Sequence, residues 1–310
     1  MRFRPFGANG MAVSAVSLAL TDAPGLPRPQ DWTALVYAAL ENGINTFEII
    51  GRDPAILDGL AVALQSVERR LVFVGIRLGA SATRMGRDFS PRTLFHTVEA
   101  TVTRTDLQYL DLVMLDDPAS DELSPEALTT LKELRNEGRV NQLGVAGEDE
   151  AIDTYILTEA FDVLATPYNL LSGWRERHRL KSSGERDMAV IGYDFYPSAI
   201  RNQQKAEASV VAKAAGWLRK QAAPAPNPLS GAGTYAFLSE TPGWTPEEIC
   251  LAYALTEPAL ATVQITTDQA ARLPELAAVA DRDLPAGAGS RVEMARFGGN
   301  QPQASGGGKA

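Results

Sequence analysis

Eight short apolar runs alternate with longer amphipathic segments along the 310-residue chain, and this alternation predicts an α/β fold, a closed (β/α)8 TIM barrel. Parallel strands that are buried on both faces appear as runs of apolar residues, whereas helices repeat every 3.6 residues. Eight units leave about 39 residues per unit, which suits an eight-stranded barrel better than a doubly wound sheet of five or six strands. Such a barrel is a single domain.

The eight strands are expected at the runs richest in aliphatic and β-branched residues. In chain order these runs are residues 16–20, 44–49, 71–76, 110–115, 140–146, 163–166, 189–193 and 261–265. Each has a length that is typical of a buried strand. The helices fall between them, and residues 31–41 and 91–103 show the helical period most clearly.

The sharpest helix start lies at Ser124, which Pro125 follows. Serine is favoured at the N-cap because its hydroxyl accepts a hydrogen bond from a free backbone N–H, and proline at the first helical position has no N–H to leave unpaired. Residues 127–137 continue the pattern, and Gly138 ends it.

Two regions interrupt the alternation. Residues 200–244 contain a helical piece at 206–219 and then a proline-rich loop at 222–228, longer than compact domains usually carry. Residues 298–310 are mostly Gly, Gln and Ser, with little to bury, so they are expected to form a flexible tail. The predicted organisation is therefore a barrel over residues 1–297 with an insertion at 200–244, followed by the tail at 298–310.

The composition of the chain argues against several classes of partner and site. The net charge of −9 disfavours nucleic acid and anionic membranes as partners, and no apolar run reaches the length of a membrane span. One cysteine, Cys250, cannot form an internal disulfide, and no export signal follows Met1, so a cytoplasmic protein is expected. Two histidines, His96 and His178, lie 82 positions apart, and Asp116 with Asp117 is too small a carboxylate set, so no metal site is predicted.

Several segments are similar to those of the aldo-keto reductases. They are Phe-Gly-Ala-Asn-Gly-Met-Ala-Val-Ser at 6–14, Ala-Leu-Glu-Asn-Gly-Ile-Asn-Thr-Phe at 39–47, and residues 107–118, 131–145 and 162–171. Together they cover most of residues 3–278. The resemblance implies a (β/α)8 barrel of aldo-keto reductase type, which binds a nicotinamide cofactor at its C-terminal mouth without a Rossmann domain.

The resemblance also implies four catalytic positions, and this chain departs from the family at each one. The family's aspartate is Glu48, its proton-donating tyrosine is Asp53, its lysine is Arg77 and its substrate-orienting histidine is Asp116. An aspartate of ordinary pKa, about 3.9, is ionised at neutral pH and has no proton to donate. Three carboxylates around one arginine would also oppose the negative charge that develops on a reduced carbonyl. No catalytic residue is therefore assigned, and carbonyl reduction is expected to be absent.

The positions that bind the cofactor in the aldo-keto reductases are better preserved in this sequence than the four catalytic positions. Tyr193 matches the family's aromatic residue that stacks on the nicotinamide, and Thr267, Arg272 and Glu275 match its adenine-side residues. The alternative for Arg272 is that it is only a solvated helix residue. The family's carboxamide ligands, a Ser-Asn pair and a Gln, are replaced by Ala146, Gly147 and Ala165. Neither Thr266 nor Asp268 offers a cation to a 2′-phosphate, so NAD(H) is expected in preference to NADP(H).

Among family members without the catalytic set, the sequence resembles an NAD(H)-binding, oxidoreductase-like regulator of cell division in alphaproteobacteria. That resemblance implies inhibition of two partners, the division-ring GTPase FtsZ and the histidine kinase DivJ, according to the bound cofactor. The small C-terminal residue Ala310, although Lys309 precedes it, makes the tail a candidate handle for a Clp-type protease.

Other interpretations of the carboxylates remain open at this point. Crowding could raise the pKa of Glu48, Asp53 or Asp116 enough to create a new acid, which would give an active NAD-dependent oxidoreductase or a lyase. Alternatively, Arg77 pairs with Glu48 or Asp116 in a structural ion network. A third possibility is a structural subunit that has lost cofactor binding.

Overall fold

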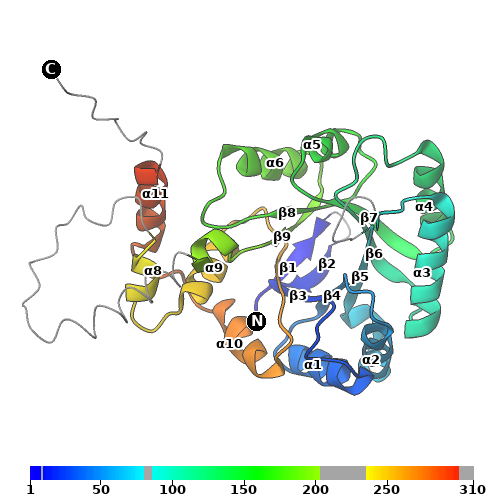
Figure 1. Ribbon diagram of the computed structural model, residues 1–310, viewed down its shortest axis with the longest axis horizontal. Coiled ribbons are helices and arrows are strands. Elements are labelled where there is room, and N and C mark those ends of the chain that lie inside the picture. Colours follow the sequence, from blue (N-terminus) through cyan, green and yellow to red (C-terminus); the bar gives the residue numbers. More distant parts are fainter. Residues whose placement is uncertain (8–9, 80–85, 203–234, 300–310) are drawn as a thin grey trace, which may run out of the picture.

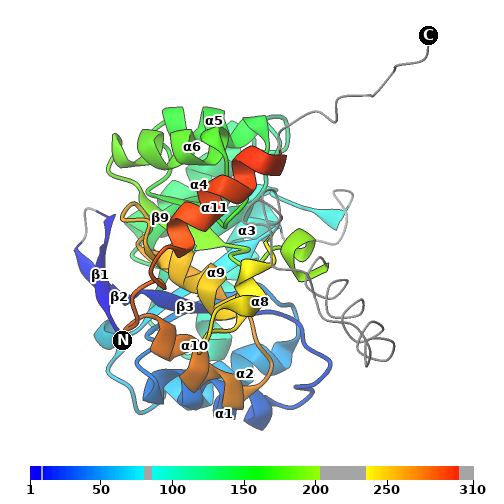
Figure 2. The ribbon, with the colours of Figure 1, turned by 90° about the vertical axis from the view of Figure 1, so that its left-hand side faces the viewer.

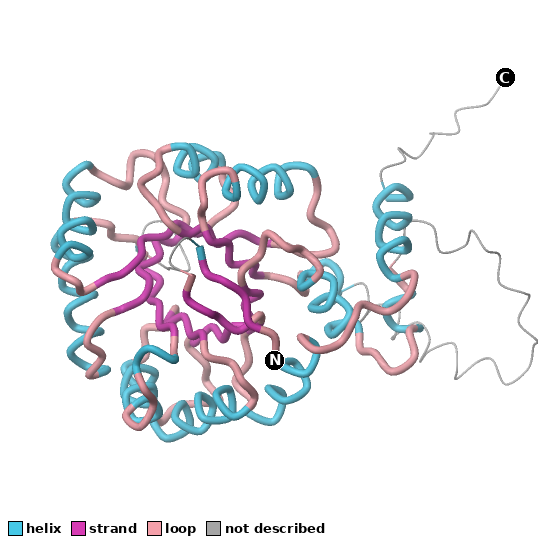
Figure 3. Tube along the Cα trace, turned by 180° about the vertical axis from the view of Figure 1, so that it is seen from behind, coloured by secondary structure: helices cyan, strands magenta, loops and turns pink. Residues whose placement is uncertain are grey.

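Eight parallel strands close into a barrel, and helices surround it (Figures 1 and 3). The computed structural model describes all residues except 8–9, 80–85, 203–234 and 300–310. Around the barrel the strands follow the order β10-β3-β4-β5-β6-β7-β8-β9. Their bounds are β3 Val16–Leu20, β4 Thr46–Ile49, β5 Phe73–Leu78, β6 Leu110–Asp116, β7 Val140–Ala146, β8 Val163–Pro167, β9 Ala189–Tyr193 and β10 Thr262–Ile265. The predicted fold class is confirmed.

One predicted strand is displaced along the chain. The third was expected at 71–76, but Arg69–Leu71 form a 3₁₀ turn and β5 begins at Phe73. Leu71 is exposed, so its apolar side chain belongs to the surface and not to the barrel. The other strands lie within two residues of their predicted ends.

The helices begin largely as the sequence predicts. Ser124 caps α4 by accepting a hydrogen bond from the Ala127 N–H, and Pro125 is its first residue. Gly138 adopts a φ of 74° directly after the helix, a conformation that glycine reaches without strain. The helices are α1 Pro29–Glu41, α2 Pro54–Leu64, α3 Pro91–Thr105, α4 Pro125–Asn136, α5 Glu150–Leu157, α6 Trp174–Gly184, α8 Phe237–Glu240, α9 Pro246–Leu255, α10 Leu273–Val279 and α11 Ala288–Gly299.

The last helix, α11, crosses the outside of the barrel (Figure 2). Arg177 on α6 forms an ion pair with Glu293 on α11 at 3.1 Å, and Arg296 donates to the Leu170 carbonyl. Because α11 continues to Gly299, residues 298–299, which were predicted to belong to a flexible tail, are helical. Residues 300–310 of that tail lie outside the described residues, as do the predicted helix at 206–219 and the proline-rich loop at 222–228.

An antiparallel hairpin, β1 Phe3–Phe6 and β2 Met11–Ser14, covers the N-terminal end of the barrel. Phe6 is fully buried, and its ring lies 4.6 Å from that of Phe73 on β5. With this end filled by apolar side chains, the open mouth is at the carboxyl ends of the strands, where barrel enzymes place their active sites. No helix in the described part of the chain is long and apolar enough to cross a membrane.

Candidate functional site

The carboxyl ends of four strands bring polar side chains together inside the barrel mouth. Glu48 comes from β4, Arg77 from β5, Asp116 from β6 and Gln264 from β10. Side chains alternate along a strand, so residues two apart share a face. The apolar neighbours of these residues pack outwards against the helices, which leaves the polar residues in the lumen.

Arg77 and Glu48 form a buried, bidentate ion pair. The Nε of Arg77 donates to Glu48 Oε1 at 2.8 Å and its second terminal nitrogen donates to Oε2 at 3.0 Å. The two side chains are 7% and 5% exposed. Gln264 Nε2 also donates to Glu48 Oε2, and Asp116 Oδ1 lies 3.5 Å from Arg77. The geometry is thus that of an ion network that joins four strands.

This network fixes the charge of Arg77. Burial alone would lower the pKa of the guanidinium, but the charge and hydrogen bonds of Glu48, with smaller help from Tyr193 and Asp116, hold that pKa above its ordinary value. Arg77 therefore stays protonated and cannot act as a general acid or a general base.

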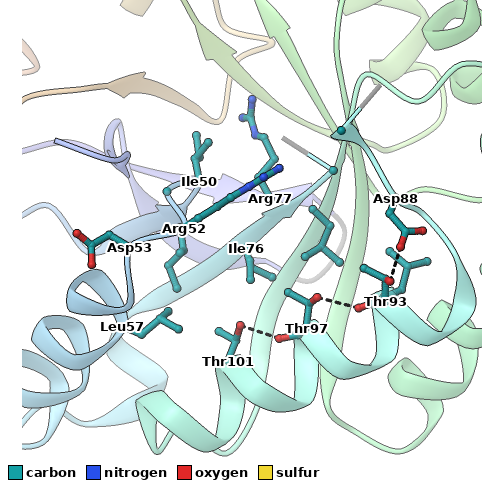
Figure 4. A pocket seen from close by; sticks show the side chains of 16 residues that line it. Ile50, Arg52, Asp53, Leu57, Ile76, Arg77, Asp88, Thr93, Thr97 and Thr101 are labelled. Carbon is teal, nitrogen blue, oxygen red and sulfur yellow. Dashed lines mark hydrogen bonds between the residues drawn. The ribbon is translucent and has the colours of Figure 1, made fainter. Parts of the chain in front are cut away.

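Asp53 does not join the network. It is the N-cap of α2, and its Oδ1 accepts a hydrogen bond from the Ala55 N–H at 2.9 Å. Its own N–H donates to Asp22 Oδ1 at 2.8 Å, and its carboxylate points away from Arg77 (Figure 4). The expectation of three carboxylates facing Arg77 is therefore corrected to two, because aspartate before a helix-starting proline is better used as a cap.

A second buried arginine, Arg87, lies beside the mouth. It is 5% exposed, donates to the backbone oxygens of Asp116 and Asp117 at 3.0 and 2.5 Å, and lies 3.4 Å from Glu122. It holds the turn after β6, where Asp117 adopts a φ of 47°. Neither Arg87 nor Gln264 was predicted from the sequence as a residue of the site. The only signal for Gln264 was a polar residue inside an otherwise apolar strand.

Tyr193 presents a neutral aromatic ring at the end of β9. The Arg77 guanidinium carbon lies 5.3 Å from the ring centroid. Burial raises the pKa of the phenol, Arg77 opposes that rise, and the carboxylates of Glu148, Asp116 and Asp117 add to it. The phenol therefore keeps its proton at neutral pH, and the half-buried ring can act as a stacking platform.

Small residues lie at the ends of the neighbouring strands. Ala146 and Ala165 are fully buried, and a Cβ on Gly147 would lie 2.6 Å from Asp117 Oδ1. These three positions provide methyl groups and backbone but no polar side chain. Any amide bound here must use backbone groups or other residues.

The residues expected on the adenine side lie after β10. Thr267 is nearly buried, and its hydroxyl accepts a hydrogen bond from the Gln269 N–H at 3.1 Å. Arg272 donates to the carboxylate of Glu247, at the start of α9. Glu275 is exposed in the first turn of α10. Arg272 is thus a paired cation. Its partner Glu247 lies 25 positions away, and the sequence gives no local signal of that pairing.

The described residues contain no group of three His, Cys, Asp or Glu side chains arranged to hold a metal ion.

Comparison with known proteins identifies the family. The model of the Aldo/keto reductase family matches residues 19–294. The chain belongs to the aldo-keto reductases. Among solved structures, the aldo-keto reductase AKR11C1 from Bacillus halodurans in its holo form is 18% identical with a TM-score of 0.67, over 94% of this chain and 95% of that one. The glycerol dehydrogenase AKR11B4 from Gluconobacter oxydans is 16% identical with a TM-score of 0.68, over 98% of both chains.

A curated relative is more similar in sequence over a shorter stretch. L-galactose dehydrogenase from Arabidopsis thaliana is 26% identical over 167 residues, which are 51% of this chain and 52% of that protein. The chain therefore matches about half the length of this relative. At their level of identity, the solved structures show the shared barrel fold and no more.

Aldo-keto reductases generally bind a nicotinamide cofactor, and the mouth fits one. Tyr193 offers a neutral ring for stacking. Thr267 and Arg272 would lie towards the adenosine end.

Loss of the buried Arg77–Glu48 pair should destabilise the fold far more than loss of an exposed ion pair. Glu48→Gln should lower the free energy of unfolding by about 3 to 5 kcal/mol, because Arg77 stays buried and loses its bidentate partner, with only the more distant Asp116 carboxylate, at 3.5 Å, left as a counter-charge. The matched control is Glu68→Gln, which removes an ion pair of 2.6 Å with Arg70 in which both side chains are exposed. That control should change the free energy by about 1 kcal/mol or less. Urea denaturation measures both, and equal effects would contradict a structural role for the buried pair.

Proposed function

We propose that the chain is an NAD(H)-binding regulator that does not reduce carbonyl groups. The observation that carries this proposal is the closed Arg77–Glu48 pair inside the mouth, with Asp53 turned away as a helix cap. Bound NADH would supply a hydride in this family, but a carbonyl oxygen also needs a proton and a positively polarised environment.

Among the residues that the structure describes, no side chain of the mouth meets the proton requirement. The Asp116 carboxylate is already engaged with Arg77, as an ion-pair partner at 3.5 Å. Tyr193 has a proton, but its raised pKa makes it a weak acid. What Tyr193 and the surrounding small residues support is binding and orientation of the nicotinamide ring.

The proposed preference for NAD(H) over NADP(H) is supported by Glu247. Its carboxylate already pairs with Arg272, so a 2′-phosphate would meet a negative charge and an occupied cation. A carboxylate at that point can instead accept a hydrogen bond from a ribose 2′-hydroxyl, as acidic residues do in other NAD sites.

The regulatory part of the proposal is supported by sequence resemblance to KidO, a cell-division regulator of alphaproteobacteria. We propose that the cofactor-bound chain inhibits FtsZ assembly and the histidine kinase DivJ, as that resemblance implies. We further propose that the C-terminal residues up to Ala310 give a Clp-type protease a starting point, so that the regulator can be removed.

A second candidate is an active oxidoreductase. The curated relative is an L-galactose dehydrogenase and one structural relative is a glycerol dehydrogenase, so alcohol oxidation is the reaction to consider. Oxidation of an alcohol needs a base to take the hydroxyl proton, and the partly exposed Asp116 carboxylate could supply one.

Cofactor titration tests the binding proposal. We expect NADH to bind more tightly than NADPH, and Glu247→Gln to raise the NADPH affinity about tenfold, or about 1.4 kcal/mol, by removing a like charge. Tyr193→Ala should weaken both cofactors through loss of the stacking face. The matched control is Glu126→Gln, since Glu126 follows the first proline of α4 as Glu247 follows that of α9. Equal wild-type affinities for NADH and NADPH would refute the selectivity.

Turnover assays test the absence of reductase activity. With NADH and a panel of aldehydes and ketones, the unmodified protein should give no rate above background, because general acid catalysis typically contributes about 10² to 10⁴-fold. Asp53→Tyr alone should not restore the rate, since Arg77 remains held by Glu48. Reduction of a carbonyl by the wild type would contradict the proposal that the chain lacks reductase activity. Oxidation of polyols with NAD⁺ that Asp116→Asn abolishes would favour the second candidate.

Sedimentation of purified FtsZ with GTP tests the regulatory part. Addition of the protein with NADH should reduce the pelleted fraction of FtsZ, and Tyr193→Ala should weaken the effect of NADH because its ring carries the cofactor contact. Bovine serum albumin at the same concentration serves as the control for crowding. A pelleted fraction that the protein leaves unchanged, with or without NADH, would contradict this function.

A further inference from the structure

A cavity of about 390 Å³ lies at the end of the barrel opposite the mouth. It is lined by the ends of α2 and α3, which are neighbours around the barrel (Figure 1), and by the residues that precede β5 and β6. Val72 in this lining and Arg77 in the mouth lie at opposite ends of β5, about 16 Å apart at the usual rise of a strand. The cavity is therefore separate from the mouth and from the proposed cofactor contacts.

Aliphatic side chains make up much of the cavity wall. Leu64, Val72 and Leu107 are buried there, whereas Val62 is 53% exposed. Ala61 and Val67 complete the apolar lining. Apolar surface thus runs from the interior of the cavity to its solvent edge, and a hydrocarbon chain that enters would be removed from water along its length. The volume is in the range of pockets that hold small molecules.

Two helices end at this cavity. The backbone dipoles of a helix leave about half a negative charge at its C-terminus, which favours a cation near the last turn. α2 ends at Leu64 and α3 at Thr105, and both residues line the cavity. The last turn of α2 contains no basic residue, and the last-turn arginine of α3, Arg104, forms a surface ion pair with Asp58 at 2.6 Å. Both helix ends can therefore attract a cation into the cavity.

Asp106 adds a full negative charge to these helix ends. It follows α3 directly with a φ of 55°, is exposed and lines the cavity. The one cation among the described lining residues is Arg69, whose charge is matched by Asp111 at 2.6 Å. Its terminal nitrogens also donate to the carbonyls of Val72 and Tyr109, each at 2.8 Å. The remaining charge in the cavity is negative, which suits a positively charged ligand.

We propose that this cavity binds a small aliphatic amine, a linear alkylammonium of about four to six carbons. Its ammonium group would lie between the Asp106 carboxylate and the ends of α2 and α3, and its chain would pack on Leu64, Val67 and Leu107. An alkyl amine is protonated at neutral pH, as a lysine side chain is with its ordinary pKa of about 10.4. A carboxylate ligand would instead be repelled by Asp106 and by both helix ends. This site is independent of the nicotinamide cofactor and goes beyond the function proposed for the mouth.

The probe for the test is n-pentylamine, titrated into the full-length protein without cofactor and followed by saturation-transfer NMR. We expect saturable binding by the wild type. The alcohol 1-pentanol has the same chain without the charge and should bind roughly tenfold more weakly, since a charged donor makes hydrogen bonds about twice as strong as a neutral one. Added salt should weaken binding of the amine and leave that of the alcohol unchanged.

Asp106→Asn tests the charge at the helix ends. It should weaken binding of n-pentylamine roughly fivefold, the effect of losing a surface ion pair. Asparagine adopts the left-handed backbone conformation as readily as aspartate does, so the turn should be kept. The matched control is Asp187→Asn, because Asp187 is also exposed, has a φ of 54° and follows a helix, α6, but lies outside the cavity. The control should bind the amine as the wild type does.

Hydrogen–deuterium exchange on the wild type keeps the test decisive if a variant does not fold. The amine should slow exchange in residues 61–72 and 105–108. Failure of n-pentylamine to bind, equal binding of the amine and the alcohol, equal binding by the two variants, or protection elsewhere would each overturn the proposal. Tighter binding of Nα-acetyl-lysine methylamide than of n-pentylamine would also overturn it, because the cavity would then take a lysine side chain of another protein. Because NADH is absent from these measurements, their failure is separate from failure of cofactor binding.

Discussion

The barrel mouth depends on one interaction, the buried ion pair of Arg77 and Glu48. Moving either charge out of water costs several kcal/mol, and attraction offsets that cost only when the geometry is good and the remaining polar atoms are satisfied. Here two parallel hydrogen bonds meet the geometric condition, while Gln264 and Asp116 add further partners. The strands β4, β5, β6 and β10 are thereby tied together at the end where a ligand would bind. The same pair removes from the lumen the free cation that a developing alkoxide would need.

In the function that we propose, cofactor recognition and proton transfer separate in this barrel. Stacking on Tyr193 needs a neutral, well-placed ring, and burial together with nearby carboxylates keeps that phenol protonated. Those same conditions make the phenol a weak acid. A mouth arranged in this way can hold a nicotinamide without advancing its chemistry, which is the property that a cofactor-responsive binding protein requires. Under the same proposal, the pairing of Arg272 with Glu247 would replace attraction for a 2′-phosphate by a hydrogen-bond acceptor for a ribose hydroxyl.

The sequence predicted the barrel well because buried parallel strands leave a local signal that needs no knowledge of tertiary contacts. The resemblance to the aldo-keto reductases placed Glu48, Arg77 and Asp116 at strand ends, and the structure brings them together. The displaced strand at β5 has a local cause, since the 3₁₀ turn before it puts an apolar Leu71 on the surface. The role of Asp53 could have been read from the proline that follows it. The family resemblance assigned it to the site instead, although its backbone and side chain serve the start of α2.

What the sequence could not supply is the pairing of distant residues. Gln264 lies 216 positions from Glu48, and Glu247 and Arg272 stand on separate helical segments. Such pairs have no periodic signature, and they decide whether a cation is available to a ligand. A paired cation holds an anionic group less strongly than a free one, since the carboxylate already present repels it. With Arg77, Arg87 and Arg272 all facing carboxylates, selection at the mouth depends less on net charge than on stacking, shape and hydrogen bonds.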